Sequence, residues 1–353
     1  MKKLALFLAM ILVIATLAGC AAPSDAGDDA ATTPDDSNAT IPDDTANDDD
    51  ATQPADDGAK DVGDLKIAFC AANSNTFGTN MKAAAVAKAD ELGVKMDYFL
   101  AEGDVDTQLN QIENAITNAY DALIVQPQNA DGCVPGIDAI HEAGIPVVTV
   151  NMRANTDSHD VYVGSDNVDA GKMQGDWLVA NADAFLTEHG YDKLEIGYIT
   201  VTMGTSTQID RFSGFKSSFM SNYENYEVLI YGESKAKRDL GMSITEDWML
   251  AYPEMNCIVC QNDSAALGAM QAIADAGRTG EILLLGIDAE QEAAQAILDG
   301  SFSMTVYQDA KGQGAGAVEA AVNLALGETY DEDVIIPFVS VDATNASDYT
   351  NQY

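Results

Sequence analysis

From Leu65 onward, short apolar runs alternate with longer segments of helical periodicity, and this alternation restricts the fold more than any other feature. The runs are rich in β-branched residues and apolar throughout, which is typical of parallel strands buried on both faces. Strands are expected at 65–71, 94–100, 121–127, 145–151, 194–200, 226–232, 256–261, 282–288 and 304–308. Helix-like segments between them include 81–92, 108–118, 171–184 and 267–276. The alternation predicts an α/β protein with doubly wound parallel sheets.

The number of expected strands is too large for one compact sheet of this kind. The alternation also breaks near residues 162–167, and a second strand–helix series begins at Leu194. We therefore expect two similar α/β units within the 353-residue chain.

The first twenty residues have the pattern of a secretory signal. Two lysines precede an apolar run that is too short for a comfortable membrane span, and the run ends in the sequence LAGC at residues 17–20. This ending resembles the lipobox of bacterial lipoproteins, and the resemblance implies that Cys20 receives a diacylglyceryl group and becomes the mature N-terminus. The alternative is an ordinary secretory signal with an incidental cysteine. Two acyl chains suffice for stable anchoring in a membrane.

Residues 21–64 are expected to form a disordered linker. Their acidic residues are all Asp, interleaved with Ala, Thr and Pro and with almost no large apolar side chain. Such a segment cannot bury enough surface to offset the entropy of ordering. A cation-binding tail is the alternative to a solvated spacer. The whole chain carries a formal net charge of -40, which argues against binding to nucleic acid or to anionic lipid surfaces.

Polar residues recur where the expected strands end, and ligands of open parallel sheets bind beyond those ends. The alternative is that these residues face solvent or cap helices. In the first half they are Asn73, Ser74, Asn75, Gln126, Gln128, Asn129, Asn151 and Arg153, with Phe77 among them, and in the second half Gln261, Asn262, Asp263, Asp288 and Gln308.

Motifs of several enzyme classes are absent from the sequence. A dinucleotide site needs G-x-G-x-x-G after the first strand, where the chain reads AANSNTFGTN, and neither a phosphate-binding P-loop nor a G-x-S-x-G elbow occurs. The three histidines lie apart, without neighbours at metal-ligand spacing. Cys257 and Cys260 form a C-x-x-C, but inside an expected strand, where they point to opposite faces and are expected to be buried structural thiols. We expect no metal, no cofactor and no catalysis.

Seven stretches together resemble the sugar-type substrate-binding proteins of ABC importers, in the ribose-binding branch of the periplasmic binding protein family. They are SNTFGTNM (74–81), DALIVQP (121–127), AGIPVVTVN (143–151), VGSDNVDAGKMQGDWL (163–178), GTSTQIDRFSGF (204–215), CQNDSAALGAMQA (260–272) and LLGIDAEQEA (284–293). The resemblance implies a type I periplasmic binding protein fold, with two doubly wound lobes, a three-crossing hinge and a ligand cleft between the lobes. It places residues 65–165 plus 309–337 in the N-terminal lobe and residues 166–308 plus 338–353 in the C-terminal lobe.

The resemblance also implies a set of ligand-binding residues. Asn, Asp and Arg present paired polar atoms that can satisfy neighbouring sugar hydroxyls, and an aromatic ring can cover the C–H face of a sugar. Asp263 is expected to cap the helix that follows it, and Asp166 and Asn167 to lie at the first hinge crossing. The implied binding residues are Asn75, Phe77, Asn151, Arg153, Arg211, Arg238, Asn262, Asp288 and Gln308.

Three departures from the ribose-binding pattern argue against ribose itself as the ligand. The chain has Asn151-Met152-Arg153 where ribose binders have Asp-Arg, Gly78 replaces a second aromatic residue, and an aromatic residue is missing near Ala236. A pocket with fewer ring walls is expected to be wider than ribose requires.

The expected function is that of a monomeric, lipid-anchored solute receptor on the extracytoplasmic face of a bacterial cell membrane. It would bind a monosaccharide or polyol and deliver it to an ABC permease. The alternatives are a sugar-sensing module for a membrane receptor, a nucleoside- or autoinducer-binding lipoprotein, and an enzyme.

Overall fold

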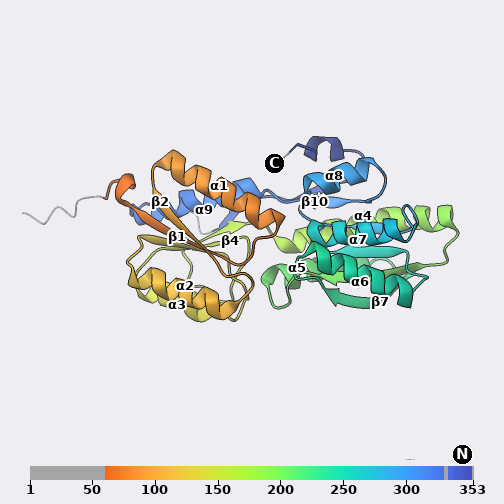
Figure 1. Cartoon of the computed structure of the whole chain (residues 1–353), viewed down its shortest axis with the longest axis horizontal. Helices are drawn as coiled ribbons and strands as arrows, with labels where there is room; N and C mark the ends of the chain where they lie inside the picture. Colours follow the sequence, from red (N-terminus) through yellow and green to blue (C-terminus); the bar gives the residue numbers. More distant parts are fainter. Residues whose placement is uncertain (1–59, 330–332, 352–353) are drawn as a thin grey trace, which may run out of the picture. The chain divides into compact units, whose positions relative to one another are not determined.

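The computed structural model describes residues 60–329 and 333–351. Its first sheet is parallel throughout. Its strand order is β11-β5-β4-β3-β1-β2. The strands are β1 (Lys66–Ala71), β2 (Lys95–Leu100), β3 (Ala122–Val125), β4 (Val147–Val150), β5 (Val161–Gly164) and β11 (Asp333–Ile335). Helices α1 (Thr76–Leu92) and α9 (Ala310–Ala325) cover one face, and α2 (Val105–Thr117) and α3 (Val134–Glu142) cover the other (Figure 1).

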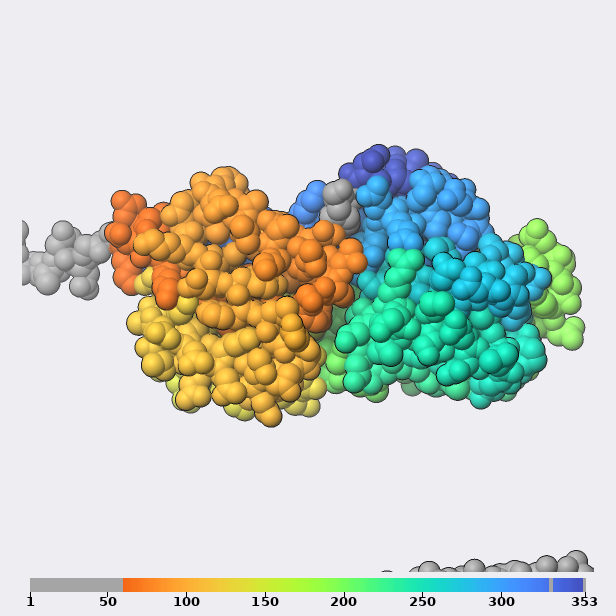
Figure 2. Space-filling view, viewed as in Figure 1, coloured from red at the N-terminus to blue at the C-terminus, as the bar shows by residue number. Residues whose placement is uncertain are grey.

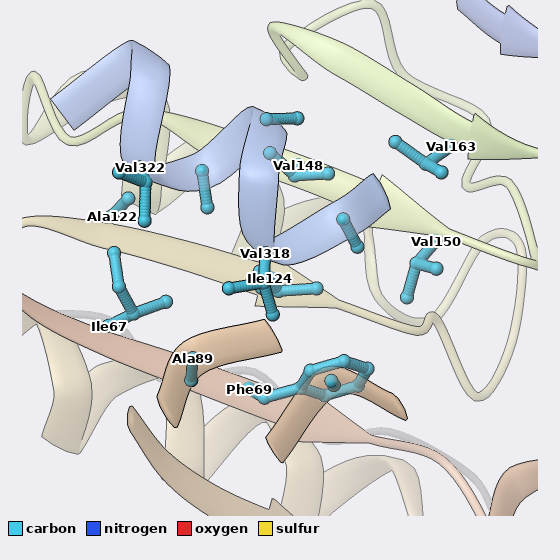
Figure 3. Close-up of a cluster of buried hydrophobic side chains, with 14 of the residues drawn as sticks. Ile67, Phe69, Ala89, Ala122, Ile124, Val148, Val150, Val163, Val318 and Val322 are labelled. Atoms are coloured by element: carbon cyan, nitrogen blue, oxygen red, sulfur yellow. The ribbon is translucent and has the colours of Figure 1, made fainter. Parts of the chain in front are cut away.

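Buried aliphatic side chains fill the space between this sheet and its helices. Ile124 of β3 lies beside Val318 of α9, and Ile67 of β1 belongs to the same cluster, as Figure 3 shows. The strands β3, β4 and β5 are buried along their whole length, because helices cover both faces of the sheet. This is why β3 and β4 could be recognised as apolar runs in the sequence.

The second sheet has the order β7-β6-β8-β9 and is also parallel. Its strands are β6 (Leu194–Thr200), β7 (Tyr226–Glu233), β8 (Cys257–Cys260) and β9 (Leu283–Leu285). The helices of this part are α4 (Asn167–His189), α5 (Ser206–Phe215), α6 (Arg238–Ala251), α7 (Asp263–Asp275) and α8 (Gln291–Leu298). Short helical segments are η1 (Val62–Asp64), η2 (Lys216–Met220) and η3 (Ala346–Tyr349), and η3 packs against α8 near the end of the chain (Figure 2).

Three short strands were not expected from the sequence. One is β5, which falls in the segment where the alternation breaks. It has only four residues and is followed by polar ones, so it does not stand out as an apolar run. The others are β11 and β12 (Val339–Val341), of three residues each. In addition, β12 pairs antiparallel with β10 (Thr305–Tyr307) in a separate two-stranded sheet. The expectation of parallel pairing is wrong for these two strands.

The chain passes from the first sheet to the second after β5, returns after β10, and leaves again after β11. We keep the predicted boundaries as working definitions, and they remain predictions. The N-terminal lobe is 65–165 plus 309–337, and the C-terminal lobe is 166–308 plus 338–353.

The predicted signal peptide, Cys20 and the linker up to residue 59 lie outside the described residues. The segment Asp57–Tyr353 forms one compact unit, and its four hydrophobic clusters lead us to expect that it folds on its own. None of the helices in the described part has the length and apolar character that a membrane span needs.

The cysteines of the described residues are Cys70, Cys133, Cys257 and Cys260, and all four are buried and free. Cys257 and Cys260 belong to different hydrophobic clusters on the two faces of the second sheet. Burial also raises the pKa of both thiols, which disfavours the thiolate that metal binding or disulfide exchange would need. The prediction that they are structural thiols is confirmed in burial and orientation.

A close crossing of α4 and α5 fixes the position of α5. A Cβ atom added to Gly171 would lie 1.9 Å from the backbone oxygen of Arg211, and one added to Gly214 would lie 2.0 Å from the backbone oxygen of Val168. Only glycine allows the two backbones to approach this closely. The crossing therefore determines where the side chain of Arg211 lies.

Replacing Gly214 with alanine is expected to lower the free energy of unfolding by about 1–3 kcal/mol, because the added methyl group forces the two helices apart. Urea denaturation of Asp57–Tyr353 measures the change. Gly63→Ala is the matched control, since a Cβ atom at Gly63 meets no atom of the described residues within 4 Å. Equal stabilities of the two variants would contradict the close crossing.

Candidate functional site

A pocket lies between the two lobes, at the carboxyl ends of the strands of both sheets. The residues that line it are Asn73, Asn75, Phe77, Gln126, Asn151, Met152, Val201, Thr202, Thr205, Thr207, Arg211, Ala236, Asn262, Asp288 and Gln308. Seven of the nine binding residues predicted from the resemblance are among them.

The N-terminal lobe contributes one aromatic wall and a row of amides. Asn75 caps the N-terminus of α1, where its Oδ1 accepts a hydrogen bond of 2.8 Å from the backbone N–H of Gly78. This cap places Phe77, which is 6% exposed, in the pocket wall. A Cβ atom at Gly78 would lie 2.8 Å from the backbone oxygen of Asn73, so the loop leaves no room for a second side chain there.

Asn151 is held in place by a chain of buried amides. Gln126 Nε2 donates to Asn151 Oδ1 at 3.1 Å, and Asn151 Nδ2 donates to Gln313 Oε1 at 3.0 Å. Gln313 Nε2 in turn donates to Ser165 Oγ at 3.1 Å. The carboxamide of Asn151 is thus engaged by the protein on both its atoms, although the residue lines the pocket.

Arg211 is the buried cation of the pocket, with an exposed fraction of 3%. Its Nε donates to Asn167 Oδ1 at 2.9 Å, and its terminal nitrogens donate to Gln308 Oε1 at 2.9 Å and to the backbone oxygen of Gln261. One terminal nitrogen lies 3.9 Å from Asp288 Oδ1. These contacts join α4, α5, the end of β8 and the end of β10 around one guanidinium group.

Asp288 lies in a cluster of buried carboxylates. Burial raises the pKa of Asp288 to about 7, and the nearby Arg211 opposes that rise. Burial is also the main reason why the pKa of Asp263 is well above its usual value. Asp263 accepts hydrogen bonds from Thr305 Oγ1 at 2.7 Å and from the backbone N–H of Glu290 at 2.8 Å.

Asn262, and not Asp263, caps the helix α7. Its Oδ1 accepts from the backbone N–H of Ala265 at 3.4 Å, whereas Asp263 turns inward to Thr305. The expectation that Asp263 is the cap was wrong, because its carboxylate finds buried donors from outside the helix. The Nδ2 atom of Asn262 is buried and has no hydrogen-bond partner among the described residues.

Three residues of the pocket have a positive φ although they are not glycine. The angles are 63° for Asn151, 56° for Ala236 and 128° for Asp288. Such backbone strain persists only where the surrounding structure enforces it, and it is concentrated at binding and catalytic sites.

Arg153 and Arg238 are the two predicted binding residues that do not line the pocket. The strained turn at Asn151 brings the backbone N–H of Met152 within 2.6 Å of the oxygen of Val150, and Met152 takes the place in the pocket wall. The guanidinium of Arg153 stacks on Tyr162 instead and reaches Asp333 at 3.2 Å. Arg238 forms two hydrogen bonds of 2.6 and 2.7 Å with Glu292 of α8.

The predicted binding set leaves out three threonines that follow β6, although Thr205 and Thr207 lie in one of the stretches that carry the resemblance. Thr202, Thr205 and Thr207 line the pocket from the loop after β6 and the first turn of α5. The signal was available, because the loop follows an expected strand and so must lie at the same edge as Asn262 and Asp288. The prediction rested on amide, carboxylate and guanidinium groups, and threonine has none of them.

Among the described residues, no group of three or more His, Cys, Asp or Glu side chains could hold a metal ion.

A model of the periplasmic binding protein domain matches residues 67–329. The chain belongs to this family. The chain passes three times between its two parallel sheets, and this is the type I periplasmic binding protein fold. Proteins of the family are substrate-binding proteins, and their location is extracytoplasmic.

Similar proteins include a putative rhizopine-binding protein of Rhizobium meliloti, 30% identical over 273 residues, which are 73% of this chain and 82% of the relative. The ribose import binding protein RbsB of Bacillus subtilis is 26% identical over 264 residues, 75% of this chain and 82% of that protein. A solved family structure, an ABC transporter solute binding protein of Bacillus halodurans with bound myo-inositol, has a TM-score of 0.76 and 30% identity and covers 83% of this chain and 99% of its own.

Proposed function

We propose that this protein is the solute-binding component of an ABC importer and binds a small polyhydroxylated ligand, a monosaccharide or polyol, in the pocket between its lobes. The observation that carries the proposal is the set of planar polar groups that converge there from both lobes. Asn262 offers a buried N–H that has no partner within the described part of the chain, and Asp288 offers a buried carboxylate beside Arg211. Vicinal hydroxyls donate and accept at once, so they match such groups.

Two further features support a sugar or polyol over other small molecules. Phe77 provides one ring face for the C–H groups of the ligand. The pocket pairs one buried cation with one buried carboxylate, so it carries little net charge toward the ligand. The relatives named above for ribose and rhizopine, and the neighbour with bound myo-inositol, support the same class of ligand.

The test is a thermal-shift screen of Asp57–Tyr353 against D-ribose, D-allose, myo-inositol, xylitol and a set of nucleosides. A ligand at about 1,000 times its dissociation constant stabilises the folded state by about 4 kcal/mol, which raises the midpoint by several degrees. We expect such a shift with at least one sugar or polyol, and its loss in Asn262→Ala.

Other outcomes of the screen would contradict the proposal in different ways. A shift with nucleosides alone would favour the nucleoside alternative. A sugar-induced shift that survives Asn262→Ala would mean that the pocket is not the binding site. Silence across the panel would remove the basis for a sugar or polyol ligand.

We further propose that Cys20 carries the lipid that anchors the protein at the extracytoplasmic face of the cell membrane, and that a permease in that membrane is the partner. The support is the LAGC sequence at residues 17–20 and the Asp-rich segment that follows as a spacer. Two acyl chains make anchoring in a membrane effectively stable.

Replacing Cys20 with serine is therefore expected to move the protein from the membrane fraction to the soluble fraction of a bacterial host. Fractionation followed by immunoblotting measures the distribution, with Cys133→Ser as the control because Cys133 is buried in the folded unit. Retention of the Cys20 variant in the membrane fraction would contradict the lipid anchor.

A further inference from the structure

Three buried polar atoms of the pocket lack a hydrogen-bond partner within the part of the chain that the structure describes. They are Asn262 Nδ2, Thr207 Oγ1 and Asn73 Oδ1. Asn262 caps α7, Thr207 lies in the first turn of α5, and Asn73 follows β1. The three atoms thus come from three elements and from both lobes, and all three residues line the same pocket.

Their chemistry describes the complementary ligand. Asn262 Nδ2 can only donate, Asn73 Oδ1 can only accept, and the hydroxyl of Thr207 can do either. A buried polar atom without a partner is rare in folded proteins, because it has lost its hydration without a replacement. A ligand hydroxyl can serve each of these atoms.

Few of the residues that line the pocket are apolar. The loop at Gly78 has no room for a side chain beside Asn73, and position 236 holds only an alanine. Among the described residues, Phe77 is therefore the one aromatic residue that lines the pocket. A ligand with an extended apolar face would leave Thr207 and Asn73 without partners. A ligand with hydroxyls around its whole perimeter would satisfy them.

We propose that Thr207 and Asn73 are specificity-determining residues that hydrogen-bond ligand hydroxyls from opposite lobes, so that the pocket prefers a fully hydroxylated polyol to its deoxy analogue. This inference rests on the proposed function. A site that is built to bond a hydroxyl rejects the analogue that lacks it, because its own polar group then stays buried and unpaired.

The test is a set of calorimetric titrations of Asp57–Tyr353 with myo-inositol, xylitol and D-ribose, and with the monodeoxy analogues of each. Thr207→Val removes the hydroxyl and keeps the shape of the side chain, whereas Thr207→Ser keeps the hydroxyl. We expect Thr207→Val to weaken binding of the parent compound about tenfold or more. For the monodeoxy analogue that lacks the hydroxyl facing Thr207, we expect Thr207→Val and the unsubstituted protein to have equal affinities. Thr207→Ser is expected to bind like the unsubstituted protein.

Asn73→Leu repeats the test from the other lobe. For this variant we expect unchanged affinity for a different monodeoxy analogue, the one that lacks the hydroxyl facing Asn73. The thermal midpoint without ligand separates a structural role from a binding role. We expect Thr207→Val to keep or raise that midpoint, because it removes an unpartnered buried hydroxyl.

The outcomes distinguish this inference from the function on which it rests. Binding of a parent compound with unchanged affinity in Thr207→Val and Asn73→Leu would overturn the inference and leave the proposed function standing. A large fall of the ligand-free midpoint in Thr207→Val would assign the hydroxyl a structural role and overturn it too. No binding of any compound by the unsubstituted protein would overturn both.

Discussion

Replacing Arg211 with methionine is expected to lower the free energy of unfolding by about 3–5 kcal/mol, the typical cost of removing one partner of a buried ion pair. Asp288 would lose the guanidinium that lies 3.9 Å from it, and Asn167 Oδ1 would lose its donor. The substitution should also abolish ligand binding, because the guanidinium holds the ends of β8 and β10 together at the pocket. Urea denaturation of Asp57–Tyr353 measures the stability.

Arg153→Met is the matched control, since both arginines were predicted to bind the ligand. The Arg153 side chain is 37% exposed, and its partner Asp333 is 45% exposed. Exposed pairs of this kind contribute about 0–1 kcal/mol. We therefore expect the Arg153 variant to keep nearly full stability and to bind ligand.

The pH dependence of the Arg211 variant gives a second criterion. Arg211 lowers the pKa of Asp288, so its removal should raise that pKa further. The carboxyl group can then take up a proton and become neutral, and the deficit in stability should be smaller at pH 5 than at pH 8. Equal stability of the Arg211 and Arg153 variants would mean that the buried pair does not hold the C-terminal lobe together.

The two-sheet fold could be predicted from the sequence because both faces of each sheet are covered by helices. A strand such as β3 then has no polar face, and its apolar run is visible without knowledge of its partners. The strands β11 and β12 carry no such signal, because each is three residues long and depends on pairing with β5 and β10, which are distant in sequence. Their existence follows from the three-dimensional structure alone.

The sequence places Asn262 and Asp288 at the pocket, because their positions follow from the ends of strands. It does not place Arg153 and Arg238, which lie outside the pocket lining, because a long side chain can reach several partners whose positions the sequence does not give. Glu292 lies 54 residues after Arg238, and its proximity depends on how α8 packs beside α6. The turn at Asn151 similarly redirects Arg153 through one strained backbone angle.

Ligand affinity is expected to fall about tenfold for each pH unit below 7, because ligand hydroxyls donate to the ionised form of Asp288. Burial raises the pKa of this carboxyl group to about 7, the neighbouring Glu290 adds to the rise, and Arg211 opposes it. Below that pH a proton competes with the ligand for the carboxylate. Asp263 is also buried nearby, but it is engaged by Thr305 and the backbone of Glu290 and does not line the pocket.

Asp288→Asn is expected to bind ligand with an affinity that does not change between pH 5 and 8. At pH 8 its affinity should be lower by about 10- to 150-fold, since hydrogen bonds to a charged group contribute about 1.5–3 kcal/mol. Asp210→Asn is the control, because burial raises the pKa of Asp210 as well and this residue does not line the pocket. The control should keep the pH dependence of the unsubstituted protein.

Stability without ligand should respond to pH in the opposite direction. The pKa of Asp288 is higher in the folded state than its ordinary value of 3.8, so the folded protein favours the protonated form. The destabilisation from the ionised carboxylate is fully present above pH 7 and is lost as the pH falls toward 4. Asp288→Asn should therefore match or exceed the unsubstituted protein in ligand-free stability at pH 8, while binding ligand less tightly. A protein that binds equally well at pH 5 and pH 8 would contradict the role of this charge, whichever sugar or polyol is the ligand.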